Sequence, residues 1–147
     1  MEAFLMTGKL LTFYLGDSLC GIDIAFAKEI NRKIQYTSVA GGRSHVVGLL
    51  NLRGQVVTLF NLNQVLKFTE KKDSARSQCI ILKEFYQGDQ VGFFIDKLGE
   101  VVDVTSDICE LPPANIRNIE GQFIAEVVKL QDKIILVLDI KKVFGVM

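Results

Sequence analysis

The sequence predicts an all-β protein made of two small barrels that pack against each other. Short apolar runs of strand length alternate with turns that contain glycine or asparagine. Part of the chain, residues 46–66, is repeated without a gap by residues 124–144. Strands this short, in copies of roughly 70 residues, favour closed barrels, because closure removes strand edges that would otherwise aggregate.

The first predicted element is a β-hairpin over residues 10–21, "LLTFYLGDSLCG". Gly16-Asp17 separates two apolar runs there, and both residue types tolerate the positive φ of a tight turn. A similar construction returns at residues 83–96, "KEFYQGDQVGFFID". Three features of the first hairpin recur in the second. Phe85-Tyr86 corresponds to Phe13-Tyr14, Gly88-Asp89 to Gly16-Asp17, and Gly92 to Gly21.

Residues 21–30, "GIDIAFAKEI", are predicted to form one strand with a single buried face. The alternation puts Ala27 and Glu29 on the outer face, and Lys28 is the inward position that breaks it. The apolar residues that set this alternation are Ile22, Ile24, Phe26 and Ile30.

The second hairpin of each copy carries the clearest repeat. Residues 46–66 laid over residues 124–144, an offset of 78, match at 12 apolar positions. Each hairpin leads into a predicted helical turn, "NLNQVLKF" in the first copy and "DIKKVF" in the second. Each copy therefore runs hairpin, long strand, loop, hairpin and helical turn, with residues 67–78 as a polar linker and Pro112-Pro113 in a loop of the second copy.

The tip of the repeated hairpin differs between the copies. It is Asn51-Leu52-Arg53-Gly54 in the first copy and Lys129-Leu130-Gln131-Asp132 in the second, so the fold itself does not require an arginine there. Arg53 is therefore a functional candidate, because its planar fork of donors suits recognition at interfaces. The alternative is a solvated turn residue that contributes little.

Composition excludes several classes of function. The 17 basic and 17 acidic residues balance, and the 10 Phe and 3 Tyr fall mostly in strand patterns, so the basic face with stacking aromatics of a nucleic-acid-binding small barrel is not expected. No apolar run approaches the ~20 residues of a membrane span, and the N-terminus has an acid where a signal peptide needs basic residues. A cytosolic protein without membrane insertion is expected.

No catalytic, cofactor or metal site is predicted. Cys20, Cys79 and Cys109 are too far apart for a paired-cysteine zinc site and suit reduced core positions. A nucleophile built from a cysteine and His45, the only histidine, lacks an evident positioned acid. Phosphate loops, metal-ligand spacings and paired acids with a common site are also missing from the sequence, which disfavours a small enzyme.

From about Lys9 to Phe144 the chain resembles the CheW family of chemotaxis coupling proteins. The resemblance is carried by "VVGLLNLRGQVV", by the preceding "LLTFYLGDSLCGIDIAFAKEI" and by the following "VGFFIDKLGEVVDV". It implies two intertwined five-stranded Src-homology-3-like barrels in a single CheW-like domain over residues 1–147. The approximate units are residues 9–68 and 79–144, with strands exchanged between them.

The resemblance also implies partners. Such proteins are non-enzymatic adaptors that link the cytoplasmic tips of methyl-accepting chemotaxis receptors to the regulatory domain of the histidine kinase CheA, itself of the same fold. The adaptor is then recruited from the cytoplasm to membrane-associated receptor arrays. By motif position, Asn51, Arg53 and Gly54 form the signature turn for partner binding, and Ala27 and Glu29 fall in a second contact region.

The chain departs from the family pattern where that pattern continues with proline, aspartate and arginine. The corresponding residues are Thr58, Asn61 and Asn63, which suggests that one acid–base pair has been removed together. We therefore expect a diverged member. A scaffold of a non-motility signalling pathway is the alternative. The start at Met1 and the end after one module favour a stand-alone adaptor over a module of a larger kinase or of a receiver-fused coupling protein.

Overall fold

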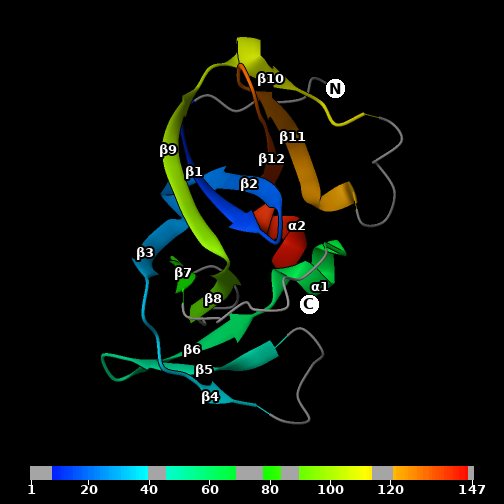
Figure 1. Cartoon of the computed structure of the whole chain (residues 1–147). Helices are drawn as coiled ribbons and strands as arrows, with labels where there is room; N and C mark the ends of the chain where they lie inside the picture. Colours follow the sequence, from blue (N-terminus) through cyan, green and yellow to red (C-terminus); the bar gives the residue numbers. More distant parts are fainter. Residues whose placement is uncertain (1–7, 40–45, 69–77, 84–89, 114–120, 146–147) are drawn as a thin grey trace.

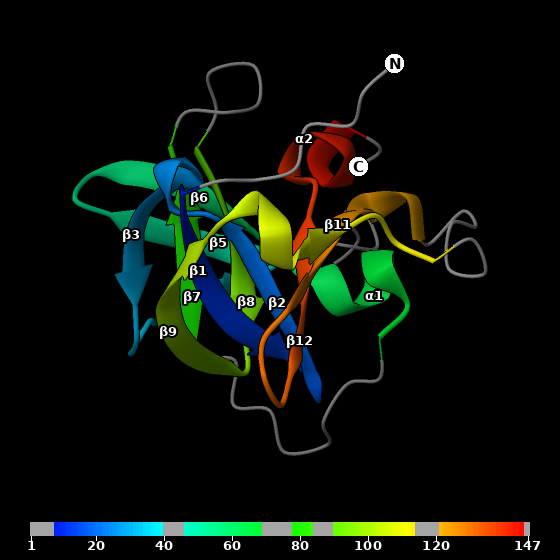
Figure 2. The same cartoon turned by 90° about the horizontal axis from the view of Figure 1, so that it is seen from above.

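The computed structural model describes residues 8–39, 46–68, 78–83, 90–113 and 121–145, and it confirms the predicted all-β class (Figure 1). These residues form two six-stranded sheets and two short α-helices. Sheet A has the order β10-β11-β12-β2-β1-β9, and sheet B has the order β3-β7-β8-β6-β5-β4. Both helices lie on one side of the molecule, opposite β3 and β9 (Figure 2). No helix in these ranges is long and apolar enough to span a bilayer.

The elements follow one another in two similar series. The first series consists of β1 (Gly8–Leu15), β2 (Ser18–Asp23), η1 (Ile24–Phe26), β3 (Ala27–Asn31), β4 (Thr37–Ser38), β5 (Val46–Leu52), β6 (Gln55–Phe60) and α1 (Leu62–Leu66). The second consists of β7 (Gln78–Leu82), β8 (Gln90–Ile95), β9 (Lys97–Val104), η2 (Ser106–Ile108), β10 (Cys109–Glu110), η4 (Gly121–Phe123), β11 (Ile124–Lys129), β12 (Ile134–Leu138) and α2 (Ile140–Gly145).

The two sheets have the same strand order once corresponding strands are matched, and each sheet contains strands from both series. The hairpin β1–β2 pairs with β9 and β12 of the second series, whereas β7–β8 pairs with β3 and β6 of the first. The first hairpins are thus exchanged. Each sheet has six strands where five were predicted, because a two-residue strand, β4 or β10, extends one edge.

The second hairpins of the two series also pair their strands in the same register. The cross-strand pair Val46–Phe60 of β5–β6 corresponds to Ile124–Leu138 of β11–β12 at the predicted offset of 78 residues. A β-bulge follows at the same place in both hairpins. Conserved bulges are built features of a strand pair, so this match identifies two copies of one structural unit.

The first hairpins correspond through their glycines. Gly21 pairs with Val137 of β12, and Gly92 pairs with Leu59 of β6, which are equivalent positions at the 78-residue offset. A Cβ added to either glycine would lie within 3 Å of a neighbouring atom, so both positions need a residue without a side chain. The remaining echo, Phe85-Tyr86 and Gly88-Asp89, lies outside the described residues.

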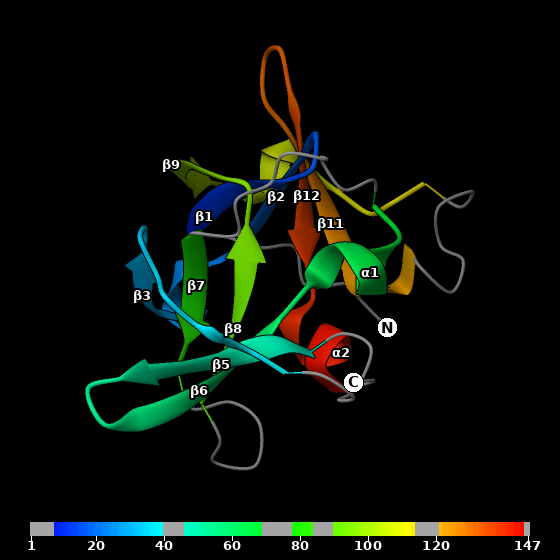
Figure 3. The ribbon, with the colours of Figure 1, turned by 60° about the horizontal axis from the view of Figure 1, so that its bottom comes forward.

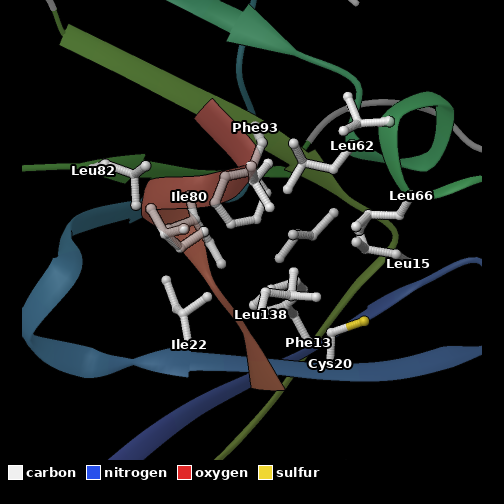
Figure 4. Packing of buried hydrophobic residues seen from close by; sticks show 14 of the residues in the cluster. Phe13, Leu15, Cys20, Ile22, Leu62, Leu66, Ile80, Leu82, Phe93 and Leu138 are labelled. Carbon is white, nitrogen blue, oxygen red and sulfur yellow. The ribbon is translucent and has the colours of Figure 1, made fainter. Parts of the chain in front are cut away.

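The main apolar core lies between the two sheets and α1 (Figure 4). Helix α2 adds Ile140, Val143 and Phe144 to this core. Phe13 of β1 and Phe93 of β8 meet there with ring centroids 5.3 Å apart, which joins the exchanged hairpins directly. Each sheet also has a smaller core of its own, around Leu10 and Ile135 in sheet A and around Leu59 and Ile81 in sheet B. Burial of these side chains is the main source of the fold's stability.

The predicted single strand over residues 21–30 is wrong. The chain leaves sheet A at Asp23, forms the 3₁₀ turn η1 over Ile24–Phe26, and enters sheet B as β3. The Asp23 side chain caps this turn by accepting a hydrogen bond from the Ala25 amide at 2.9 Å. The same two-residue spacing of apolar side chains is therefore produced by two strands in different sheets with a turn between them.

Candidate partner-binding site

The tip of the β5–β6 hairpin is a two-residue turn formed by Arg53 and Gly54, with Leu52 and Gln55 as the last strand pair. Both turn residues have positive φ, 50° for Arg53 and 83° for Gly54, as in the type I′ turns that suit the twist of hairpins. Glycine adopts this conformation at no cost, whereas arginine pays about 1 kcal/mol. The Asn51 side chain accepts a hydrogen bond from the Gly54 amide at 3.2 Å and so fixes the turn.

Arg53 forms an ion pair with Glu29, the acidic residue of the second predicted contact region. An Nη atom of Arg53 lies 2.8 Å from Oε2 of Glu29. The arginine side chain is 66% exposed and the glutamate side chain only 25%. The structure thus joins two regions that are 24 residues apart in the sequence into one surface.

A β-bulge in β3 explains why Glu29 does not lie on an open outer face, as the alternation predicted. Ala27 pairs with Leu82 and Glu29 pairs with Ile81, so Lys28 is the extra residue of the bulge. Lys28 is exposed, whereas Ala27 and Glu29 are half-buried. The prediction that Ala27 and Glu29 share an open outer face is therefore wrong, although Glu29 keeps one edge toward Arg53.

Arg53 compensates the negative charge of the half-buried Glu29 carboxylate. Its second oxygen, Oε1, is buried and has no hydrogen-bond partner among the described residues. Burial raises the pKa of the nearby Cys79 thiol to about 12, and the negative charge of Glu29 adds to this shift. A half-buried charge held by one donor is sensitive to loss of that donor.

The other sheet has the equivalent positions without the ion pair. The offset of 71 residues between Gly21 and Gly92 also relates Glu29 to Glu100 of β9, and β9 is bulged against β1 at the matching place. At the β11–β12 tip the Leu130 amide donates to the Lys133 carbonyl at 2.9 Å, so Gln131 and Asp132 form the same two-residue loop. Neither has positive φ. Glu100 is exposed and takes part in no ion pair among the described residues.

The two tips also share an exposed aliphatic residue. Val56 is 63% exposed and Ile134 is 56% exposed. Both copies of the repeat have an apolar residue at this position, as they do at the core positions, yet the side chain is not buried in either copy. Both hairpins project from the body of the molecule, as Figure 3 shows for β5–β6 and for the loop between β11 and β12. An exposed aliphatic residue on the same hairpin as Arg53 gives it the mixed apolar and cationic character of protein interfaces.

The departures from the family pattern lie at the start of α1. Asn61 is the N-cap, and its side chain accepts a hydrogen bond from the Asn63 amide at 3.0 Å. Both asparagines are buried, while Thr58 is half-buried on β6. Neutral amides therefore fill two buried positions at the start of this helix.

The three cysteines occupy the three apolar cores, as predicted for structural thiols. Cys20 lies in the main core, Cys79 in that of sheet B and Cys109 in that of sheet A. Burial raises the pKa of Cys20 to about 12 and that of Cys109 to about 11. Thiols in this state are poor nucleophiles. His45, which was considered and disfavoured as the partner of a cysteine nucleophile, lies outside the described residues.

Comparison with known proteins gives consistent matches over nearly the whole chain. A family model described as CheW-like domain matches residues 9–146. A chemotaxis protein CheW of Treponema pallidum is 30% identical over 141 residues, which cover 93% of this chain and 82% of that protein. The Bacillus subtilis chemotaxis protein CheW is 25% identical over 140 residues, with coverages of 95% and 88%.

A solved structure has the same fold. The scaffolding protein TtCheW of Thermoanaerobacter tengcongensis superimposes with a TM-score of 0.78 at 25% sequence identity. The superposition covers 91% of this chain and 90% of that chain.

Proposed function

This chain belongs to the CheW-like domain family, and from that premise we propose that it is a non-enzymatic chemotaxis adaptor. It couples the cytoplasmic tips of chemoreceptors to the regulatory domain of the histidine kinase CheA, so that receptor state controls kinase activity. It acts in the cytoplasm at membrane-associated receptor arrays.

The observation that carries this proposal is the contact between Arg53 and Glu29. Both residues were expected to bind partners because of where they lie in the family pattern. They come from separate strands, β3 and the β5–β6 tip, and the 2.8 Å ion pair makes them one continuous surface. A partner that binds either residue changes the energy of the pair, and therefore acts on the other.

The mechanism follows from this coupling. Arg53 is mostly exposed and free to gain a second acidic neighbour, whereas Glu29 is mostly covered and keeps a buried oxygen without a partner. A partner carboxylate at Arg53 competes with Glu29 for the guanidinium donors. Such competition shifts the population of the hairpin tip, and a shift in population is how a bound receptor biases a bound kinase.

The internal repeat supplies a matched test. Arg53→Glu places an acid beside Glu29 and removes the forked donor, whereas Gln131→Glu introduces the same acid at the equivalent tip of the other sheet. Each variant is assembled with a receptor signalling fragment and full-length CheA, and complex formation and kinase activity are measured. We expect loss of receptor-dependent kinase regulation with Arg53→Glu and near-normal regulation with Gln131→Glu. Equal behaviour of two folded variants would contradict the role of Arg53.

A further inference from the structure

The gap between the hairpin tip and the edge strand is bridged in one sheet and open in the other. In sheet B the side chain of Arg53 crosses from the β5–β6 tip to Glu29 on β3. In sheet A the equivalent residues are Gln131 and Glu100, and no ion pair joins them. A groove of about 570 Å³ lies there, lined by residues of β1, β2, β9 and the β11–β12 hairpin.

The walls of this groove combine aliphatic side chains with polar and charged groups. Leu19, Leu98 and Leu130 line it as half-buried side chains, and Ile135 lies fully buried at its base. Leu19 and Leu130 also pack on the small core of sheet A, so the groove is a place where that core is not fully covered. An apolar side chain inserted from outside would remove this surface from water, which is favourable.

The charged lining differs from that of the equivalent positions in sheet B. Lys97 belongs to the β9 wall and Lys133 to the hairpin wall, where sheet B has Phe26 and Gln55. Both lysines are exposed, and neither forms an ion pair with a described residue. Glu100 is the one acid among the described residues of the lining, so these residues carry an excess of positive charge.

We propose that this groove binds an acidic peptide segment of a partner protein, with an apolar side chain between β9 and the β11–β12 hairpin and carboxylates at Lys97 and Lys133. The excess of lysine over glutamate favours an anionic partner. The leucine side chains of the lining favour a segment in which aliphatic residues adjoin the acids. This inference does not depend on the proposed coupling through Arg53, which lies on the other sheet.

The direct test is a titration of the full ¹⁵N-labelled chain at low ionic strength, followed by amide NMR. The probes are three blocked peptides, acetyl-Glu-Leu-Leu-Leu-Glu-amide and its counterparts with Gln or Arg in place of Glu. We expect the acidic peptide to shift the amide signals of Leu98, Glu100 and Leu130 and to bind at least about fivefold more tightly than the Gln peptide. Tightest binding by the Arg peptide, or shifts confined to other regions, would overturn the proposal.

Two double variants locate the charge effect. Lys97→Gln with Lys133→Gln should abolish the preference for the acidic peptide. Lys9→Gln with Lys129→Gln removes the same charge outside the groove, where these lysines pair with Asp103 and Glu110, and should preserve the preference. If both double variants lost the preference for the acidic peptide equally, the net charge of the protein would explain the preference, and the assignment of Lys97 and Lys133 as the binding residues would be overturned.

A third variant tests the location through closure of the groove. Gln131→Arg with Asp132→Gly reproduces the Arg-Gly tip of sheet B and offers Glu100 an arginine, so the groove should close and peptide binding should be lost. Retained binding in a variant with an unchanged melting curve would exclude the groove as the site. Sedimentation of the unliganded chain tests whether the groove is occupied by a second copy of the chain. If the chain self-associates and the Lys97→Gln, Lys133→Gln double variant does not, the proposal that a separate partner binds the groove would be overturned.

Discussion

Arg53 and Glu29 lie 24 positions apart in the chain, yet they form an ion pair of 2.8 Å between a hairpin tip and an edge strand. Glu100 and Gln131 occupy the equivalent positions of the other sheet without such a pair. The protein therefore contains its own reference for almost any experiment on the Arg53 surface. A change made at one position can be repeated at its counterpart on the same fold.

The ion pair should show a measurable coupling energy. We expect Arg53→Gln to lower the free energy of unfolding by about 1 kcal/mol, because Glu29 is then left half-buried without its donor. In a Glu29→Gln background the same change should cost less than about 0.5 kcal/mol. Urea denaturation of the four proteins gives this cycle. The control cycle, Glu100→Gln with Gln131→Ala, should show no coupling, and a similar value in both cycles would contradict a specific pair.

Gly54, in the turn that presents Arg53, should be required for its positive φ and not for the space around it. A Cβ added to Gly54 meets no atom within 4 Å, but the residue has a φ of 83°. Gly54→Ala should therefore destabilise the protein by about 1 kcal/mol through strain alone, while Gly54→Asn should cost less, because asparagine tolerates this region. Thermal unfolding measures both. Equal losses for alanine and asparagine would indicate a cause other than the positive φ.

The crowded glycine of β8 should respond differently. A Cβ at Gly92 would lie 2.9 Å from the carbonyl oxygen of Ile80, a backbone atom that cannot easily move. At Gly21 the closest atoms are 2.7 Å away but belong to the side chain of Leu10, which has bonds about which it can rotate, and not to the backbone. We expect Gly92→Ala to destabilise the protein more than Gly21→Ala does, with a loss of roughly 1–3 kcal/mol from overpacking. The reverse order in denaturant melts would contradict the predicted packing.

Alkali should weaken the protein through its buried thiols. The pKa of Cys20 rises from an ordinary value of 9.0 to about 12, so the folded state retains a proton that the unfolded chain loses. Its contribution is complete below pH 9 and is lost as the pH rises from about 9 to 12. Between these limits the loss approaches about 1.4 kcal/mol per pH unit. Denaturant melts at pH 8 to 11 should therefore show a shallower decline for Cys20→Ala than for the unchanged chain.

Partner binding should not require any of the cysteines. Each lies inside an apolar core. We expect serine substitutions at Cys20, Cys79 and Cys109 to lower stability by about 1 kcal/mol or more while binding to receptor fragment and CheA persists. Loss of binding by a fully folded variant, as judged by melting and circular dichroism, would contradict a purely structural role.

The sequence was sufficient to predict features that depend on local pattern. The repeat at an offset of 78 residues, the turn at Arg53-Gly54 and the helical turn after each hairpin all appear as expected. These features follow from alternating burial and from turn residues, which act over a few positions.

Features that depend on contacts between distant segments could not be predicted from local pattern. The alternation across Ile22, Ile24 and Phe26 is the same for one continuous strand as for a strand followed by a 3₁₀ turn, so the crossing between sheets was missed. The bulge at Lys28 shifts Glu29 from the open face that the alternation assigned to it. The Arg53–Glu29 contact was also missed, because it joins segments that are far apart in the sequence. The repeat did contain one signal for Glu29, since a glutamate, Glu100, recurs at the equivalent position.

The exchange of the first hairpins also has a consequence for synthesis on the ribosome. Cys20 of β2 pairs with Leu136 of β12, a separation of 116 residues in a chain of 147. Sheet A therefore cannot be completed until nearly all of the chain has emerged, and sheet B must wait for β8. Contacts of such long range slow folding and make it cooperative. Neither half of the gene should encode an independently stable product, and the two sheets should be gained or lost together.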